Sequence, residues 1–163
     1  MKNEKYKIKS ASEQELLLYC FAGEALCAIQ HIEDAISHSI VLKINAPPTK
    51  PEADQLLEKH RSYTLGKAIK ISEEASLYNE VLQQELKRFL SERNWLVHRS
   101  IALSRDEWDA NVSRDKLFSR LKAITTNVQR LQRLIENDLI EFAEAQGKDM
   151  SRVKAYINKH DVE

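Results

Sequence analysis

Apolar residues recur every three or four positions along two long stretches of the chain. The first stretch holds Leu18, Ala22, Ala25, Ile29, Ile32, Ile36 and Ile40. The second holds Leu117, Leu121, Ile124, Val128, Leu131 and Ile135. At 3.6 residues per turn, this spacing places the apolar residues of each stretch on one face of an α-helix. The two stretches therefore predict two long helices, each with a face to bury.

Turn-forming residues are scarce, which limits the chain to long elements and few loops. Its 163 residues include only three glycines and three prolines, and no Asn-Gly or Asp-Gly pair marks a β-hairpin. We expect an all-α protein with a single helical domain over 1–163. Its core is expected over about 12–145, followed by a short terminal helix over about 151–159.

Helix-capping patterns divide the chain into elements. Boxes of the form Ser/Thr-x-x-Glu begin at Ser12, Thr49 and Ser104, and prolines 47 and 48 stop the first helix. The expected helices cover about 12–43, 50–59, 65–72, 78–103, 113–145 and 151–159. Three long helices with two short ones in the first connection predict an up-down bundle. The first helix is also apolar on a second side near Leu16–Phe21, which suggests a dimer interface.

The overall charge excludes a protein that binds nucleic acid through a strong global basic field. Lysine and arginine balance aspartate and glutamate, the net charge is zero and the pI is about 7.0. Any contact with RNA or DNA must therefore be local. The charged start MKNEKYKIKS has no apolar segment of a signal peptide, and the apolar run Leu16–Ala22 is too short to span a bilayer. We expect a cytoplasmic protein with no membrane partner.

Two cysteines, Cys20 and Cys27, lie seven residues apart on the first predicted helix. At 1.5 Å per residue they are about 10 Å apart, which is too far for a disulfide between them. We expect reduced, buried thiols.

The predicted helix over 78–103 has a break in its apolar stripe, within the sequence SERNWLVHRS at residues 91–100. The stripe before the break consists of Leu82, Leu86 and Phe89. The next place on it is Arg93, and the one after is Val97, beside His98. A charged side chain thus stands where an apolar one is expected.

The residues at the break suit one kind of chemistry. Arginine offers a planar fork of donors to a phosphate, and histidine can take or give a proton near neutral pH. Arg93, Asn94 and His98 would therefore suit metal-free RNA cleavage, in which the ribose 2′-hydroxyl attacks the adjacent phosphate. On an ideal helix, Arg93 and His98 point about 140° apart, so a bend or a second chain must bring them together. Alternatively, Arg93 extends to solvent or pairs with a buried acid.

The motif and the order of the helices resemble the HEPN superfamily of small α-helical domains. The family motif is an arginine, four to six residues and a histidine, with a polar residue directly after the arginine. Here it reads Arg93, Asn94, Trp95-Leu96-Val97 and His98, and the likeness in element order covers about 12–145.

The resemblance implies a homodimer in which two motifs face each other across a cleft. Many family members are metal-independent ribonucleases, including toxins and phage-defence effectors, whereas others bind nucleotides or act as non-catalytic partners. By this likeness, Arg93 and His98 form the catalytic pair, Asn94 supports them, and no cofactor is needed. The implied partners are a second copy, RNA or a nucleotide, and an antitoxin or nucleotidyltransferase. Ser100 replaces the tyrosine that such a transferase modifies in one toxin subgroup, which puts that control in doubt.

Flanking residues extend the candidate site, and each has a plainer interpretation. Arg99 and Arg105 could contact phosphates or form surface ion pairs. Four aromatic residues could stack on bases or pack in the core: Trp95, Trp108, Tyr63 and Tyr78.

A second candidate site lies on one face of the first predicted helix. Its residues are Cys20, Glu24, Cys27, His31 and His38. At most Glu24, Cys27 and His31 are close enough to share a zinc ion, because the row is about 27 Å long. The alternative is a semi-polar face at a subunit contact.

Two further functional classes stay open beside the ribonuclease. One is a non-catalytic helical module that binds a nucleotide or a protein partner. An Arg93 that is buried against an acid such as Glu24 or Glu33 would favour this class. The other is a purely structural bundle within a larger assembly.

Overall fold

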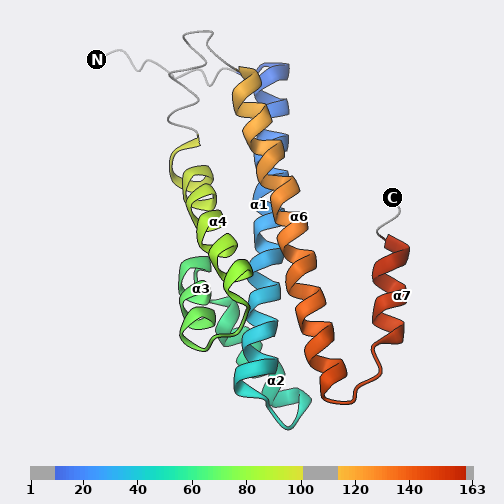
Figure 1. Cartoon of the computed structure of the whole chain (residues 1–163). Coiled ribbons are helices and arrows are strands. Elements are labelled where there is room, and N and C mark those ends of the chain that lie inside the picture. The colour runs from blue at the N-terminus through green and yellow to red at the C-terminus, as the bar shows by residue number, and fades with distance from the viewer. Residues whose placement is uncertain (1–9, 101–113, 161–163) are drawn as a thin grey trace.

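The computed structural model describes residues 10–100 and 114–160, and every element in this part of the chain is helical. The long helices are α1 (Glu13–Ser39), α4 (Glu80–His98) and α6 (Arg114–Ala145). α1 and α6 run side by side in the same direction, and α4 runs the opposite way (Figure 1). The predicted all-α, up-down bundle is confirmed.

Shorter helices complete the described part. α1 continues directly into a π-helix, η1 (Ile40–Asn45), which ends at Ala46 with a left-handed φ of 43°. α2 (Lys50–Arg61) and α3 (Leu65–Glu74) lie at the end of the bundle where α4 begins (Figure 1). α7 (Ser151–His160) stands apart from the bundle, on the far side of α6 from α1 (Figure 1).

Side-chain caps explain where most helices begin. The Ser12 hydroxyl accepts the Glu15 amide, and the Glu15 carboxylate accepts the Ser12 amide, so both halves of the predicted capping box form. Thr49, Thr64 and Asn79 likewise accept a backbone amide three residues on, at the starts of α2, α3 and α4. Each cap satisfies a donor that the first turn leaves without an intrahelical partner.

The end of α4 differs from the prediction. The expected helix extends to Leu103, but α4 ends at His98, and Arg99 leaves helical geometry with φ −127°. The Ser100 hydroxyl then donates to the Leu96 carbonyl, which satisfies one of the last acceptors of the helix. Residues 101–113 are outside the described part, and so are the Ser104 capping box, Arg105 and Trp108.

The core forms where the apolar stripes of the long helices meet. Its fully enclosed members are Ile32, Ile36, Ile40, Leu65, Leu86, Phe89, Leu121, Val128, Leu131 and Ile135. Burial of each side chain of this size contributes about 1.5–3 kcal/mol. Phe21 near the start of α1 meets Phe118 near the start of α6 edge-on, with ring centroids 5.6 Å apart. This contact fixes the parallel register of the two helices.

The inner face of α1 lies in this core, but the helix is apolar on other sides too. The continuous helix Glu13–Asn45 is long and apolar enough to cross a membrane by length and composition alone. Core helices of soluble proteins pass the same test. Ala25, Ile29, Ile32 and Ile36 are buried against the rest of the bundle, but only 17% of the apolar window as a whole is buried.

The predicted burial of the two cysteines is wrong. Cys20 and Cys27 are both free thiols, and both are exposed. They lie on the face of α1 opposite Ile29 and Ile36, so the same helix that buries its isoleucines turns its cysteines to solvent.

Candidate functional site

Arg93 projects from α4 toward α1 and forms an ion pair with Glu33. The distance between Arg93 Nη2 and Glu33 Oε1 is 3.6 Å, and the two side chains are 22% and 28% exposed. Arg93 occupies the core-facing stripe of α4, one turn after Phe89. The charge that interrupts the stripe is therefore balanced by a carboxylate from the neighbouring helix.

The Glu33 pair leaves part of the guanidinium unused. Arg93 Nη1 donates to Asn94 Oδ1 at 3.4 Å, a long hydrogen bond. Arg93 Nε and Glu33 Oε1 are buried, and neither has a hydrogen-bond partner among the described residues. Because a buried donor without a partner costs about 1–3 kcal/mol, this pair is poorly satisfied.

His98 does not lie beside Arg93 within one chain. α4 is one continuous α-helix from Glu80 to His98, so the offset of about 140° expected for an ideal helix applies. Arg93 is half-buried, whereas Asn94, His98 and Arg99 are exposed. A single described chain therefore does not bring the two predicted catalytic residues together.

Trp95, a predicted base-stacking candidate, is covered within the chain. The Arg120 guanidinium of α6 lies over its ring, 3.6 Å from the centroid. Arg120 also forms a bidentate ion pair with Glu92, in which Nε donates to Oε2 at 3.0 Å and Nη2 donates to Oε1 at 3.2 Å. Trp95 thus joins the end of α4 to α6 and is packed against the core.

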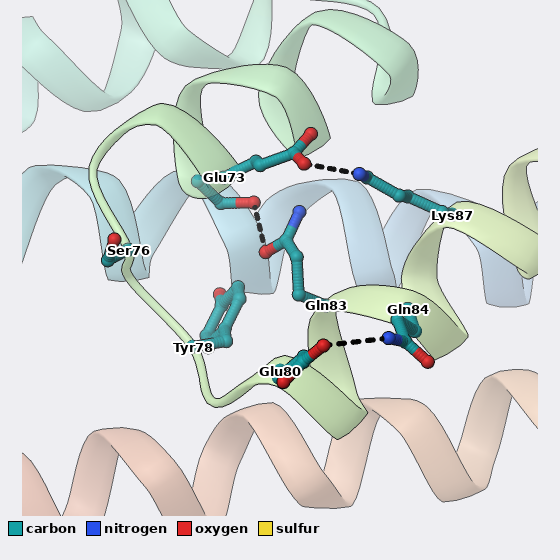
Figure 2. Close-up of a pocket in the computed structure, with 8 residues that line it drawn as sticks. Glu73, Ser76, Tyr78, Glu80, Gln83, Gln84 and Lys87 are labelled. Atoms are coloured by element: carbon teal, nitrogen blue, oxygen red, sulfur yellow. Dashed lines mark hydrogen bonds and ion pairs between the residues drawn. The ribbon is translucent and has the colours of Figure 1, made fainter.

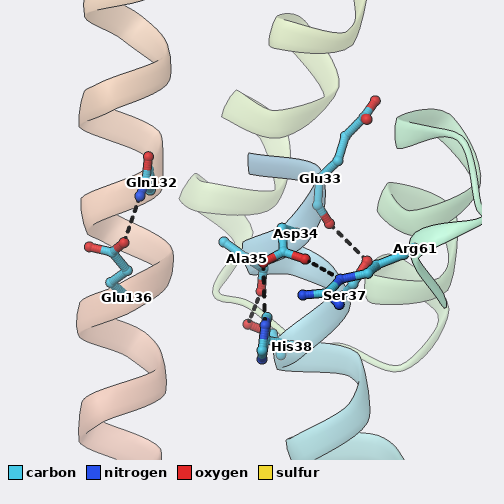
Figure 3. A network of polar contacts seen from close by, with 9 residues as sticks. Glu33, Asp34, Ala35, Ser37, His38, Arg61, Gln132 and Glu136 are labelled. Atoms are coloured by element: carbon cyan, nitrogen blue, oxygen red, sulfur yellow. Dashed lines mark hydrogen bonds and ion pairs between the residues drawn. The ribbon is translucent and has the colours of Figure 1, made fainter. Parts of the chain in front are cut away.

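Asp34 and His38 of α1 belong to a second network of polar contacts. Asp34 accepts from Arg61 Nε at 2.6 Å and pairs with His38 at 3.3 Å, which ties α1 to the end of α2 (Figure 3). Burial alone would raise the pKa of Asp34. The hydrogen bond from Arg61 and the charges of His38 and Arg61 outweigh burial and hold that pKa below its usual value.

The predicted metal-ligating row on α1 does not gather around one point. Cys20, Glu24, Cys27 and His31 are all exposed, and His38 pairs with Asp34 instead. No group of three or more ligating side chains forms in residues 10–100 and 114–160.

A largely covered lysine, Lys43, is a feature that the sequence did not reveal. Lys43 of η1 pairs with Asp138 of α6, and its side chain is only 10% exposed. Its ammonium lies 5.3 Å from the centroid of the Phe142 ring and 5.8 Å from that of Tyr78. Burial, with the nearby Asp138 charge, raises the pKa of Tyr78, and the neighbouring Ser39 hydroxyl opposes this shift. The Tyr78 hydroxyl is buried and has no hydrogen-bond partner among the described residues. These contacts fasten the ends of α1 and α6 together.

A shallow pocket lies where the chain passes from α3 to α4 (Figure 2). Its charged groups are already engaged: Glu73 pairs with Lys87, and Gln84 donates to Glu80. Gln83 donates to the Ile69 carbonyl at 3.0 Å. The polar groups of the pocket therefore hold α3 and α4 together and leave little for a ligand.

Comparison with known proteins gives no match among protein-family models, curated proteins or solved structures.

Proposed function

We propose that this chain is an HEPN-like domain that cleaves RNA without a metal, at a cleft completed by a second copy. The supporting observation is Arg93, a guanidinium on the core-facing stripe of α4 whose side chain is 22% exposed and whose Nη2 lies 3.6 Å from Glu33. Such a group retains donors and charge for a phosphate, and exposed Asn94, His98 and Arg99 follow it along the helix.

In this proposal each side chain has a distinct part in the reaction. His98 moves protons: it accepts one from the 2′-hydroxyl or gives one to the leaving 5′-oxygen. The 2′-oxygen forms a bond to phosphorus as the bond to the 5′-oxygen breaks, leaving a 2′,3′-cyclic phosphate and a 5′-hydroxyl. Arg93 stabilises the charge that develops on the phosphate oxygens, and Asn94 orients the guanidinium. Because Arg93 and His98 of one chain diverge, His98 would act with the Arg93 of its partner. We expect the protein to meet its RNA in the cytoplasm.

A specific observation favours a second candidate, a non-catalytic module that binds a nucleotide or a protein partner. Glu33 already pairs with Arg93 inside the chain, so the guanidinium has a resident carboxylate. This candidate predicts RNA or nucleotide binding with no turnover.

Cleavage of RNA in EDTA distinguishes the two. The ribonuclease proposal expects products with 2′,3′-cyclic ends from the wild type and none from His98→Ala. Binding by both proteins without cleavage by either would favour the non-catalytic module.

A further inference from the structure

The zero net charge of the chain conceals an uneven distribution of charge along α6. Between residues 115 and 134 this helix has the acid Asp115 and these bases: Lys116, Arg120, Lys122, Arg130 and Arg133. Between residues 135 and 145 it has no base and these acids: Glu136, Asp138, Glu141 and Glu144. The contact of Arg120 with Trp95 places the basic part of α6 beside the end of α4 that carries the candidate motif. A local basic surface is thus available near the motif.

One face of α4 points to the basic part of α6. We call this face the α4 strip, and it consists of Arg88, Glu92, Trp95 and Arg99. Their spacing of four, three and four residues places them within about 60° of one another around the helix. Glu92 and Trp95 both contact Arg120 of α6, which fixes the direction of the strip. Arg88 and Arg99 are exposed on either side of that contact.

A corresponding face of α6 meets the α4 strip. We call it the α6 strip, and the following residues lie within about 80° of one another on it: Lys116, Arg120, Asn127 and Arg130. Arg120 forms the bidentate ion pair with Glu92, and Arg130 pairs with Glu85 of α4. These contacts join the two strips into one surface, the α4/α6 seam.

The same contacts determine which residues lie opposite each other in the seam. Arg120 of α6 lies opposite Glu92 and Trp95 of α4. α4 and α6 run in opposite directions (Figure 1). Lys116, one turn before Arg120, is therefore close to Arg99, one turn after Trp95. The seam thus ends with two bases that come from different helices.

The charges of the seam suit an extended polyanion. Its acids, Glu85 and Glu92, are each paired with an arginine, and three further bases are exposed: Arg88, Arg99 and Lys116. Two like charges close together repel each other, and an anion between them relieves this repulsion. Arg88 and Arg99 are about 16 Å apart along α4, which is too far for one phosphate to contact both. A strand with several phosphates can contact both ends.

We infer that a single-stranded RNA binds along the α4/α6 seam, with phosphates at Arg99 and Lys116 and at Arg88. The inference rests on the proposed ribonuclease function and adds the class of its substrate. His98 directly precedes Arg99, so a strand that is held at Arg99 passes beside the proposed catalytic histidine. An unpaired strand is needed because the 2′-oxygen must come into line with the breaking bond, a geometry that a regular duplex does not give. Contacts to phosphates alone imply little preference for base sequence.

Fluorescence anisotropy with a single-stranded RNA tests the seam. Methyl groups on the 2′-oxygens prevent cleavage of this RNA. The seam variant, Arg88→Gln with Lys116→Gln, should raise the Kd at least about tenfold. It should also lower the slope of log Kd against log salt concentration by about 1.4, because each lost phosphate contact removes about 0.7. Arg88→Lys with Lys116→Arg keeps both charges and should bind like the wild type.

The matched control is Arg152→Gln with Lys159→Gln. It removes the same charge from exposed positions of α7. α7 contacts Glu144 of α6 through Lys154, about 42 Å along α6 from Lys116. The control should therefore leave the Kd and its salt dependence unchanged.

Steady-state kinetics with a cleavable RNA separates this inference from the ribonuclease proposal. The seam variant should raise KM at least about tenfold and change kcat by less than about twofold, whereas His98→Ala should lower kcat. A wild type that binds RNA through the seam without cleaving it would support the inference and contradict the ribonuclease proposal.

The inference would be overturned by a seam variant that binds the RNA like the wild type while the wild type still cleaves it. An equal loss of affinity in the α7 control would also overturn it, because overall charge would then explain binding. Tighter binding of a duplex RNA than of a single strand of the same length would contradict the proposed substrate class. A wild type with no affinity for single-stranded RNA would overturn this inference and the ribonuclease proposal together.

Discussion

Glu33 Oε1 on α1 lies 3.6 Å from Arg93 Nη2 on α4, and this ion pair links the candidate motif to α1. The carboxylate keeps a half-buried guanidinium in place without satisfying all of its donors. It therefore competes with any phosphate for Arg93.

Glu33→Gln should weaken the fold slightly and strengthen anion binding. The amide keeps the shape of the side chain but loses its charge, so the free energy of unfolding should fall by about 1 kcal/mol. The affinity for an RNA blocked at its 2′-hydroxyls should rise at least about threefold, because phosphate no longer competes with a carboxylate. Urea unfolding and fluorescence anisotropy measure the two effects.

Glu73→Gln is the matched control for Glu33→Gln. Glu73 also pairs with a basic residue of α4, Lys87, which lies six residues before Arg93. The Glu73→Gln variant should leave the affinity for RNA unchanged. Equal gains from both variants would mean that overall charge, rather than release of Arg93, determines binding.

The partly buried pair between Lys43 and Asp138 should be sensitive to removal of the acid. Asp138→Asn leaves the ammonium beside two rings without a counter-charge and should cost about 2–4 kcal/mol. Lys43→Met keeps the packing on Phe142 and Tyr78 and should cost less than half as much. Urea unfolding of both variants measures the difference. A larger loss from Lys43→Met would contradict this account of the pair.

The sequence predicts most of the helices of this fold, because the signals for them are local. Ser12, Thr49 and Gly147 mark helix ends through caps and turns that involve only neighbouring residues. The core stripes were also predictable, since a period of 3.6 residues determines which side chains share a face. The π-helical turn at η1 and the early end of α4 at His98 have no comparable local signal.

Relations between helices could not be read from the sequence. Cys20 and Cys27 lie on a second apolar side of α1, and only the position of the neighbouring helices decides which side is buried. Glu33 was one of two acids expected as a partner for Arg93, but Lys43 and Asp138 are 95 residues apart and were not expected as a pair. Likewise, the sequence gives the residues of the motif but not the direction in which each points.

His60 should make the fold less stable as the pH falls. Burial, with the positive charges of Lys59 and Lys67, lowers the pKa of His60 from 6.5. The unfolded chain therefore takes up a proton at a higher pH than the folded chain, which favours unfolding. The free energy of unfolding should decrease as the pH falls below about 6.5 toward the folded pKa. The corresponding loss at Asp34, whose pKa is lowered from 3.8, should appear only in stronger acid.

Thermal unfolding between about pH 7 and pH 5 measures this effect. His60→Gln removes the titrating group and should flatten the dependence. Lys67→Gln removes one of the charges that lower the pKa of His60. This variant should make the pH dependence of unfolding less steep but should not abolish it. An unchanged slope in His60→Gln would show that other groups cause the dependence.

Cleavage of a single-stranded RNA in EDTA, compared between the wild type, His98→Ala and His31→Ala, tests the central claim most directly. Both histidines are exposed on long helices, so neither variant should lose its fold. The account predicts products with 2′,3′-cyclic phosphate ends from the wild type and from His31→Ala. It predicts a rate at least about a hundredfold lower from His98→Ala. Cleavage at the wild-type rate by His98→Ala, or no cleavage by a wild type that is folded and dimeric, would contradict it.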